Sequence, residues 1–521
     1  MPETSEQRTT DAGLRADVLA RARAAYRAGD LLDAWADCLR LAALSREADD
    51  AAGLADAATV LRSTPDPVLN GRVHALAAEA LARLGGRDPV RSARLRAQLV
   101  ATADPFLRED PDADGDDGAP GADAEGAFLA LQARHAELLG VAHLDERLAL
   151  GRSGIALGRR TGVAEYALWG RRWRMDVHAV RGNRVDLLAE LAAAARTAER
   201  LGSRTWTAHL QLTEAAQRLW DGRFDEAVAR ADAALQTSGG AGDVRHLHLV
   251  MVAAAAQLTG GPALDAATGA VADAVDGLPY FARAWLCSLL CAADRREEGA
   301  ALWRSIAPHV QEMPERAPEW LIATVSHAEI CVWLGDTATA AVLRDLLAPW
   351  SDLEASAYAS TPYTGPVSYA LGRLAVLLGE VEEGRRLLLD ALARTERLHA
   401  LPYLALTHAA LARLDGAATR SGRAHAETGL RFARRLGMAP LVDELTALVE
   451  AAEPRAGRLS TREREVAALV AEGLSNATIA GRLGVSERTV ESHVSHVLTK
   501  LDSRSRAAVA AWWTRQEPRR G

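Results

Sequence analysis

The sequence predicts an all-α protein in which a helical-repeat α-solenoid is followed by a small four-helix domain. Residues 11–452 are rich in Ala, Leu, Arg and Glu, and their apolar positions recur at helical rather than strand spacing. Turn signals divide this region at regular intervals. Residues 458–521 contain four short amphipathic segments, three of them introduced by a serine of the kind that caps helices.

Length, composition and charge indicate a folded, multidomain protein with one basic end. The chain has 521 residues, of which 49% are hydrophobic, and a formal net charge of -8. Residues 458–521 hold 11 Lys/Arg and 7 Asp/Glu and carry +4, which leaves -12 on residues 1–457. Attraction for nucleic-acid phosphates is therefore concentrated at the C-terminal segment.

Several classes of protein are disfavoured by what the sequence lacks. The four cysteines form no CxxC pair, and no spacing suits a disulfide framework or a zinc site. There is neither a signal-peptide pattern nor an apolar run of the roughly 20 residues that a membrane helix needs. The single lysine, Lys500, follows Thr499, so the chain has no phosphate-binding P-loop. We expect a cytoplasmic protein that is not an enzyme, has no cofactor or metal, and does not contact a membrane.

Residues 11–452 are expected to form helix pairs joined by tight turns. A turn residue followed five positions later by a small or apolar residue recurs along the chain at intervals of 33 to 44 residues, the range of helix-pair repeats. These pairs are Gly182/Leu187, Gly222/Ala227, Gly261/Ala266, Asp294/Gly299, Gly335/Ala340 and Gly379/Gly384, with an earlier one at Gly29/Ala34. Neither helix of a pair can bury its apolar stripe alone, so neighbouring pairs should stack.

Three segments are expected to lie outside the packed helices. Residues 1–10 read as a disordered N-terminus, and residues 453–457 read as a linker before the last domain. Residues 108–126 are acidic and rich in Pro and Gly, which predicts a mobile loop, either a solvated spacer or a docking segment for a basic partner.

The C-terminal domain has the pattern of a helix-turn-helix. Ser460 and Glu463 form a capping box for a helix over about 461–472, and Ser475 caps a second helix that ends at Leu483. Gly484 supplies the turn, and Ser486 caps a third helix over 487–501. A fourth helix is expected over about 503–515. Val490, Val494, Val497 and Leu501 share one face of the third helix and should point inward.

The outward face of helix 487–501 is the predicted recognition surface, because a helix of this kind enters the major groove while the helix before it crosses the backbone. The candidate DNA-binding residues are Ser475, Asn476, Thr478, Arg488, Thr489, Glu491, Ser492, Ser495, His496, Lys500 and Arg504.

Some of these residues have a second interpretation. Arg488 contacts a base edge or a phosphate, or is a solvated surface charge, and Glu491 accepts from a cytosine or forms a salt bridge on the helix surface. Lys500 and Arg504 read as phosphate contacts. His493 reads as a packing residue, and one of Trp512 and Trp513 is expected to pack on the domain while the other covers a dimer seam.

The domain resembles the LuxR-type helix-turn-helix family. The matching residues are Leu459-Ser460, Arg462-Glu463-Arg464-Glu465-Val466, Gly473-Leu474-Ser475-Asn476, Ile479-Ala480, Leu483-Gly484-Val485-Ser486, Thr489-Val490, His493, Lys500-Leu501 and Arg506. The resemblance implies binding to double-stranded DNA and a homodimer that pairs through the fourth helix. Ala477 and Glu491 stand where the family often has lysine, and His496 where it often has asparagine, so we expect modest monomer affinity.

The repeat region resembles degenerate tetratricopeptide repeats, and the whole chain resembles the C-terminal portion of large ATP-binding LuxR regulators without their NTPase domain. We therefore expect a transcription regulator whose repeat region senses a protein or small molecule. Aromatic and polar residues of that region line a ligand groove or belong to the core: Gln211, Trp220, Trp285, Trp333, Trp350 and Tyr363. The alternative is an interaction scaffold with a weak or vestigial DNA-binding domain.

Overall fold

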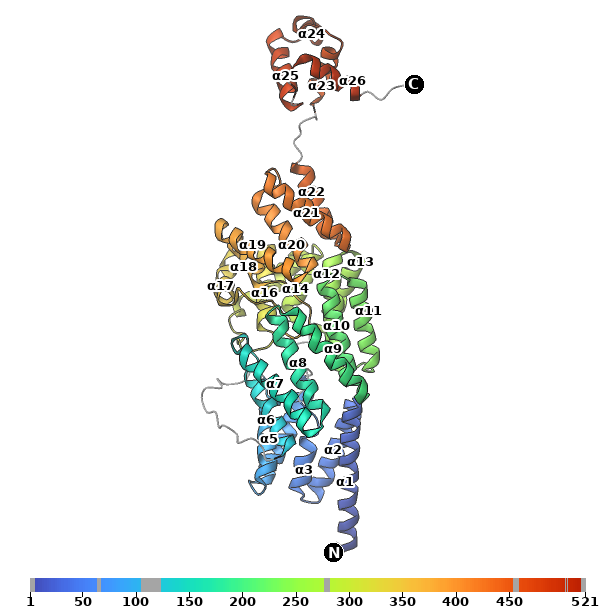
Figure 1. The fold of residues 1–521 in the computed structure, drawn as a ribbon. Coiled ribbons are helices and arrows are strands. Elements are labelled where there is room, and N and C mark those ends of the chain that lie inside the picture. The colour runs from blue at the N-terminus through green and yellow to red at the C-terminus, as the bar shows by residue number, and fades with distance from the viewer. Residues whose placement is uncertain are drawn as a thin grey trace. The chain divides into compact units, whose positions relative to one another are not determined.

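The protein is helical wherever its structure is described. The computed structural model describes residues 5–62, 67–104, 123–275, 282–452, 459–501, 503 and 505–516. These residues form the α-helices α1–α26, short 3-10 helices and no strand (Figure 1). An isolated antiparallel bridge joins Glu354 to Pro366. The all-α fold class expected from the sequence is confirmed.

The chain divides into two compact units. The first comprises residues 1–410 and 429–442, and the second comprises residues 411–428 and 443–521. The division runs through the last helices before the C-terminal domain, which are α20 (Leu401–Asp415), α21 (Arg420–Leu436) and α22 (Ala439–Ala452). The predicted linker 453–457 lies outside the described residues.

The first unit begins with five helices around one apolar cluster that includes Trp35, Leu54 and Leu76, and with a sixth helix that packs on the fifth. The helices are α1 (Ser5–Ala28), α2 (Leu31–Glu47), α3 (Ala51–Ala58), α4 (Pro67–Leu84), α5 (Pro89–Thr102) and α6 (Ala124–Glu137). The prediction of disorder over 1–10 is wrong from Ser5 onward. Once the packed part of α1 has nucleated, each added residue gains one backbone hydrogen bond, so a polar segment can extend the helix.

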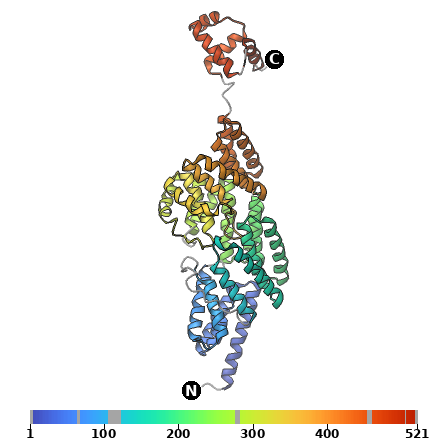
Figure 2. The same ribbon diagram turned by 60° about the vertical axis from the view of Figure 1, so that its left-hand side comes forward.

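The middle of the first unit is a series of antiparallel helix pairs (Figure 1, Figure 2). Its helices are α7 (Leu144–Thr161), α8 (Ala164–Val180), α9 (Arg184–Leu201), α10 (Arg204–Trp220), α11 (Phe224–Thr237), α12 (Gly242–Thr259) and α13 (Gly261–Ala274). Next come α14 (Ala282–Ala292), α15 (Arg296–Ile306), α16 (Trp320–Leu334), α17 (Thr337–Leu347), α18 (Val367–Leu377) and α19 (Val381–Leu398). Helices α10, α12, α14, α16 and α18 each contact the next in this order, as expected when pairs stack in series.

The turns between paired helices agree with the sequence pattern except at one place. Gly182, Gly222 and Gly335 have φ between 68° and 76°, and Asp294 has φ 59°. The position five residues later is buried at Leu187, Ala227 and Ala340, among others. The Gly261/Ala266 pair is wrong, since Ala266 is exposed and Leu264 and Ala267 are buried instead. Gly260 ends α12 and also caps α13, so this turn is shorter than the others and shifts the buried positions.

A buried irregular segment interrupts the series between the 3-10 helix Ala348–Trp350 and α18. Within it the Glu354 side chain is fully buried and accepts a hydrogen bond of 2.7 Å from the Tyr363 hydroxyl. The Glu354 amide donates to the Val180 carbonyl at 2.8 Å, and the Ala359 amide donates to Asp176 at 2.9 Å. Burial of a non-helical segment leaves its backbone polar groups without water or helix partners, and residues near the end of α8 supply hydrogen bonds to two of them.

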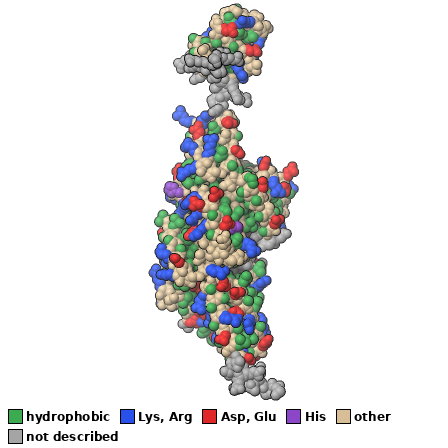
Figure 3. All heavy atoms as spheres, turned by 90° about the vertical axis from the view of Figure 1, so that its right-hand side faces the viewer, with side chains coloured by type: hydrophobic (Ala, Val, Ile, Leu, Met, Phe, Trp, Pro, Cys, Tyr) green, Lys and Arg blue, Asp and Glu red, His purple; other side chains and the backbone are tan. Residues whose placement is uncertain are grey.

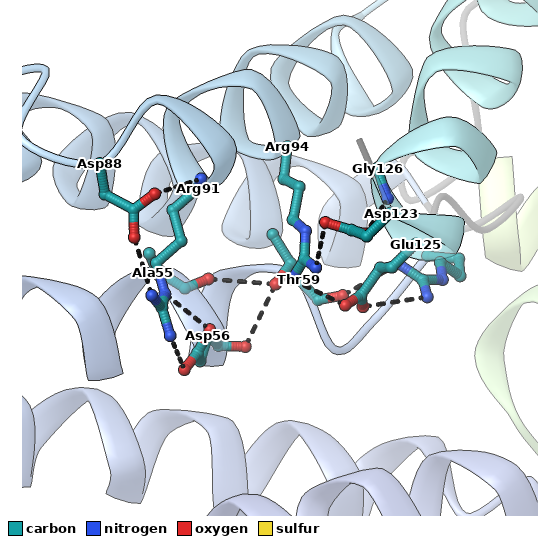
Figure 4. A network of polar contacts seen from close by, with 10 residues as sticks. Ala55, Asp56, Thr59, Asp88, Arg91, Arg94, Asp123, Glu125 and Gly126 are labelled. Atoms are coloured by element: carbon teal, nitrogen blue, oxygen red, sulfur yellow. Dashed lines mark hydrogen bonds and ion pairs between the residues drawn. The ribbon is translucent and has the colours of Figure 1, made fainter. Parts of the chain in front are cut away.

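Arginines of α5 hold the neighbouring helices through a polar network (Figure 4). Arg91 reaches Asp56 of α3 at 3.0 Å and Asp88, the cap of its own helix, at 2.8 Å. Arg94 reaches Asp123 and Glu125, both at 2.8 Å. These last two contacts are made by residues that the sequence assigns to a mobile loop.

The expected loop 108–126 therefore ends earlier than predicted. Asp123 caps α6 by accepting from the Gly126 amide at 2.9 Å, and α6 begins at Ala124. Two ion pairs to Arg94 and a helix cap hold this end of the segment in place. The acidic composition of the segment indicates neither the ion pairs nor the cap. The rest of the predicted loop, residues 108–122, lies outside the described residues.

Charges on the first unit are mixed rather than gathered by sign. On the face drawn in Figure 3, basic and acidic side chains alternate over the helices. No helix formed by the described residues has the length and apolar character needed to cross a membrane.

Candidate nucleic-acid interface

Three serine caps build the C-terminal domain. The Ser460 hydroxyl accepts from the Glu463 amide at 3.2 Å, and Glu463 Oε2 accepts from the Ser460 amide at 2.7 Å, so the predicted capping box starts α23 (Thr461–Ala471). Ser475 accepts from the Thr478 amide at 3.2 Å and starts α24 (Asn476–Leu483). Each cap satisfies an amide that the first turn of a helix leaves without a partner.

A three-residue turn joins α24 to the candidate recognition helix. Gly484 ends α24 with φ 68°, a left-handed conformation that glycine adopts without strain. Ser486 then accepts from the Thr489 amide at 3.2 Å and starts α25 (Glu487–Lys500). The predicted helix 487–501 therefore ends one residue early, at Lys500.

The face assignment of α25 is confirmed. Val490 and Val497 are buried in the domain core, and Val494 and Leu501 pack partly buried against it. The predicted outward residues are all exposed: Arg488, Thr489, Glu491, Ser492, Ser495 and His496. Because the apolar stripe fixes the rotation of the helix, these six side chains share the surface that remains.

The outward face of α25 has one unpaired cation. Arg488 makes no hydrogen bond or ion pair with any residue that the structure describes, so it is not the partner in the surface salt bridge that was one of the two interpretations of Glu491. By contrast, Arg482 of α24 pairs with Glu472 at 2.7 Å. The Arg488 guanidinium is therefore available to a base edge or a phosphate.

Three of the predicted contact residues, Ser475, Thr478 and Thr489, take part in the caps at the start of α24 and α25. The hydroxyls of Ser475 and Thr478 lie 2.8 Å apart, and those of Ser486 and Thr489 lie 2.7 Å apart. Ser475, Thr478 and Thr489 are exposed all the same. A phosphate can approach both helix starts, where the positive end of the helix dipole favours it.

Asn476 is linked to the last helix. Its carboxamide oxygen accepts from Arg506 Nη1 at 2.6 Å, and Arg506 Nη2 donates to the Leu474 carbonyl. Arg506 starts α26 (Arg506–Gln516), which begins three residues later than the predicted 503–515 helix. The Ser505 side chain accepts from the Ala508 amide at 3.3 Å, so Ser505 rather than Ser503 occupies the cap.

Lys500 has an intramolecular partner that its assignment as a phosphate contact did not anticipate. Its ammonium lies 2.6 Å from Glu463 Oε2, and the Glu463 side chain is 6% exposed. Burial alone would raise the pKa of Glu463, but hydrogen bonds from Lys500 and Ser460 outweigh it and lower that pKa. Lys500 therefore joins the end of α25 to the start of α23.

Of the other residues discussed from the sequence, the structure describes Trp512, Trp513 and His493. Arg504 lies outside the described residues. Trp512 and Trp513 are both partly buried against the domain core, with ring centroids 6.2 Å apart, so both pack on the domain. His493 is half-buried, in keeping with a packing residue.

Arg462 is a structural residue that the sequence analysis did not single out. It donates to the Leu483 carbonyl at 2.7 Å and thereby satisfies the last turn of α24 from α23. Its partner lies 21 residues along the chain, so no local pattern reveals the contact.

This geometry is matched by a known family. Residues 458–513 match the family described as bacterial regulatory proteins, luxR family. They form a LuxR-family helix-turn-helix domain. The nitrate/nitrite response regulator protein NarL of Escherichia coli is 46% identical to the chain over 55 residues, which are 11% of this chain and 26% of NarL.

A second relative covers the same LuxR-family domain. The oxygen regulatory protein NreC of Staphylococcus haemolyticus is 50% identical over 48 residues, 9% of this chain and 22% of NreC. The chain thus spans about a quarter of the length of these relatives. The similarity reaches none of the helical repeats.

The aromatic residues considered for a ligand groove do not gather at one site. Trp220 and Tyr363 are buried and stacked with centroids 3.9 Å apart, whereas Trp285, Trp333 and Trp350 pack against other core clusters. Over the described part of the chain, no group of three or more His, Cys, Asp or Glu side chains is placed to hold a metal ion.

Proposed function

We propose that the protein is a DNA-binding transcription regulator that inserts α25 into the major groove of double-stranded DNA. The observation that carries the proposal is the exposed face around Arg488, an unpaired cation on a helix whose rotation is fixed by buried Val490 and Val497. A helix presented in this way fits the width of the major groove. The two relatives are themselves described as regulatory proteins.

Roles within the interface follow from position. Arg488 near the start of α25 reads a base edge, with Thr489, Glu491, Ser492, Ser495 and His496 lining the rest of the groove-facing surface. Ser475, Asn476 and Thr478 hold a phosphate at the start of α24. Lys500 and Arg504 contribute positive charge, Lys500 while paired with Glu463.

We propose further that two copies act together and that the helical repeats receive the signal. The groove-facing helix carries two cations, Arg488 and Lys500, and two glutamates, so a single domain neutralises few phosphates. Two half-sites bound by a homodimer would multiply that affinity. The repeat region is large, stacked and mixed in surface charge, which suits recognition of a protein or small-molecule effector.

The alternative is an interaction scaffold whose terminal domain binds DNA weakly. It is favoured by the pairing of three cations within the domain, since Arg462, Arg482 and Lys500 all have carboxylate partners. A scaffold would bind its partner protein through the repeats and would need no base contact.

The two functions are separated by selecting sheared genomic DNA on the full-length protein and sequencing what is retained. The regulator should enrich discrete sites, and Arg488→Ala should lose or change them. Arg482→Ala is the matched control, because it removes the same charge from the exposed side of α24. If no site is enriched, or both variants alter the retained DNA equally, the regulator proposal fails and the scaffold remains.

A further inference from the structure

The first unit contains a cavity of about 670 Å³ between the α1–α2 turn and helices α8, α10 and α12. Small-molecule sites in proteins are typically hollows of about 300–1,000 Å³ with apolar walls and a few polar groups. This cavity has both kinds of lining, and its polar groups are not all satisfied by the protein.

Two tryptophans form an aromatic wall of the cavity. Trp169 of α8 and Trp206 of α10 lie edge to face, with ring centroids 5.3 Å apart and planes at 84°. This arrangement leaves flat apolar surface for a ring, since aromatic rings prefer offset or edge-to-face contacts.

Arg172 places a cation beside that wall, and its charge lowers the pKa of the buried Asp176 carboxyl, which burial raises overall. Its guanidinium carbon lies 5.5 Å from the centre of the Trp169 ring. Its neighbours Arg171 and Arg174 both pair with Glu190, at 2.5 and 2.6 Å, whereas Arg172 has no hydrogen bond or ion pair with a described residue. A guanidinium with five donors and no acceptor suits a carboxylate.

The polar side of the cavity is buried and incompletely bonded. His209 Nε2 lies 3.1 Å from Asp243 Oδ2, and the two side chains are 9% and 4% exposed. Among the described residues, neither His209 Nδ1 nor Asp243 Oδ2 has a hydrogen-bond partner, although both atoms are buried. Such an orphaned atom costs free energy unless something else bonds to it, so it points to a ligand in the cavity.

The carboxylates that line the cavity have polar partners within the protein. Asp243 is paired with His209, and Glu165 accepts from the Tyr26 hydroxyl at 2.7 Å. Burial would raise the pKa of Asp243, but His209 and the charge of Arg172 lower it. Ser203, the first residue before α10, makes no side-chain cap, so that helix start also favours an anion. Arg172 is therefore the lining cation to which a ligand carboxylate can bind without breaking a hydrogen bond or ion pair to a described residue.

We propose that this cavity binds a small aromatic carboxylate, with its ring against Trp169 and Trp206 and its carboxylate on Arg172. A ligand whose ring carries a polar atom can in addition bond to His209, a contact that the unsubstituted naphthalene probes below leave out. As the site of a regulatory signal the proposal rests on the function proposed above, but binding in the cavity is independent of DNA and is measured without it.

The test is calorimetric titration of the full-length protein with naphthalene-2-carboxylate and with its neutral analogue naphthalene-2-carboxamide. The acid should bind about tenfold or more tightly than the amide, and Arg172→Met should abolish that preference. Arg152→Met is the matched control, since Arg152 is an exposed residue of α7 outside the cavity.

A second variant tests the same cavity in case Arg172→Met does not fold. Ala28→Trp adds bulk from the exposed end of α1 that lines the cavity and should weaken binding of both probes. Equal affinity for acid and amide, or no binding of the acid at roughly millimolar concentration, overturns the proposal. Unchanged affinity in both Arg172→Met and Ala28→Trp overturns it as well. Loss of DNA binding with intact carboxylate binding would count against the regulator function alone.

Discussion

Lys500 Nζ lies 2.6 Å from Glu463 Oε2, the same oxygen that accepts the Ser460 amide at 2.7 Å. One buried carboxylate thus caps α23 and anchors the end of α25. The exposed side chains of α25 are positioned by this link as well as by the apolar stripe beneath them.

Removing the Lys500 ammonium should loosen the domain. Lys500→Met leaves Glu463 buried with one partner fewer, and the loss of a hydrogen bond between charged groups costs about 1–3 kcal/mol. Amide hydrogen exchange of the full-length protein should therefore quicken in peptides covering α23 and α25. The combined variant Lys500→Met, Glu463→Gln should recover part of the protection, because no buried charge is left unpaired.

The same pair separates a structural from a DNA-contacting role of Lys500. If the Lys500 ammonium neutralises a phosphate, Lys500→Met should reduce the salt dependence of DNA binding by about one ion. Glu463→Gln breaks the ion pair but removes no cation, so it should leave that slope unchanged. Identical slopes in both variants would assign Lys500 to stability alone.

Acid should act on the domain through Glu463. Because its pKa is lower in the folded protein, the stability it contributes is present above its unfolded pKa and is lost as pH falls through the folded value. Exchange protection of α23 should thus decline below about pH 4. Glu463→Gln should flatten this decline, and an equally steep decline in that variant would show that other carboxylates are responsible.

Local sequence signals predicted the helices of this domain well, and contacts between distant residues explain what they missed. Ser460, Ser475 and Ser486 each cap the helix that follows, as the sequence indicates. The pairing of Lys500 with Glu463 joins positions 37 residues apart, and no pattern in the sequence marks it. Sequence alone therefore located the candidate interface but assigned Lys500 only one of its two possible roles.

Arg506 offers a test of how α26 supports the interface. It bonds to Asn476 at 2.6 Å and to the Leu474 carbonyl, so Arg506→Met frees the start of α24. We expect DNA affinity to fall about three- to tenfold, because the proposed phosphate contact at Asn476 would lose its fixed orientation. Asn476→Ala in the same assay should cost a similar factor, and the double variant should cost little more than either. Additive losses would mean that the two residues act independently.

In the helical repeats, turn residues were predictable and close helix contacts were not. The turns at Gly182, Gly222 and Gly335 follow from glycine's left-handed conformation, whereas the shortened turn at Gly260 shifted the expected register. The buried segment that contains Glu354 and Tyr363 has no helical pattern, and its burial depends on partners in α8. Burial of such a segment is decided by tertiary contacts that composition does not encode.

Two helix backbones in the repeats approach closely, and this predicts whether an alanine at the contact stabilises or destabilises the protein. At Gly170 of α8 an added Cβ would lie 2.5 Å from the Gly151 carbonyl oxygen and 2.8 Å from the Ile155 amide nitrogen of α7. Gly170→Ala should therefore force the two helices apart and destabilise the protein by about 1–3 kcal/mol, which outweighs the roughly 1 kcal/mol that alanine gains over glycine in a helix. Amide exchange in α7 and α8 should quicken.

The identical substitution at Gly269 should act in the opposite direction. Gly269 lies within α13, and an added Cβ there meets no atom within 4 Å. Gly269→Ala should then slow exchange in α13 by up to about fivefold, because only the helix propensity changes. Faster exchange in both variants would mean that alanine disturbs these helices through something other than contact. Unchanged exchange at α7 and α8 in Gly170→Ala would mean that the two helices move apart without loss of stability.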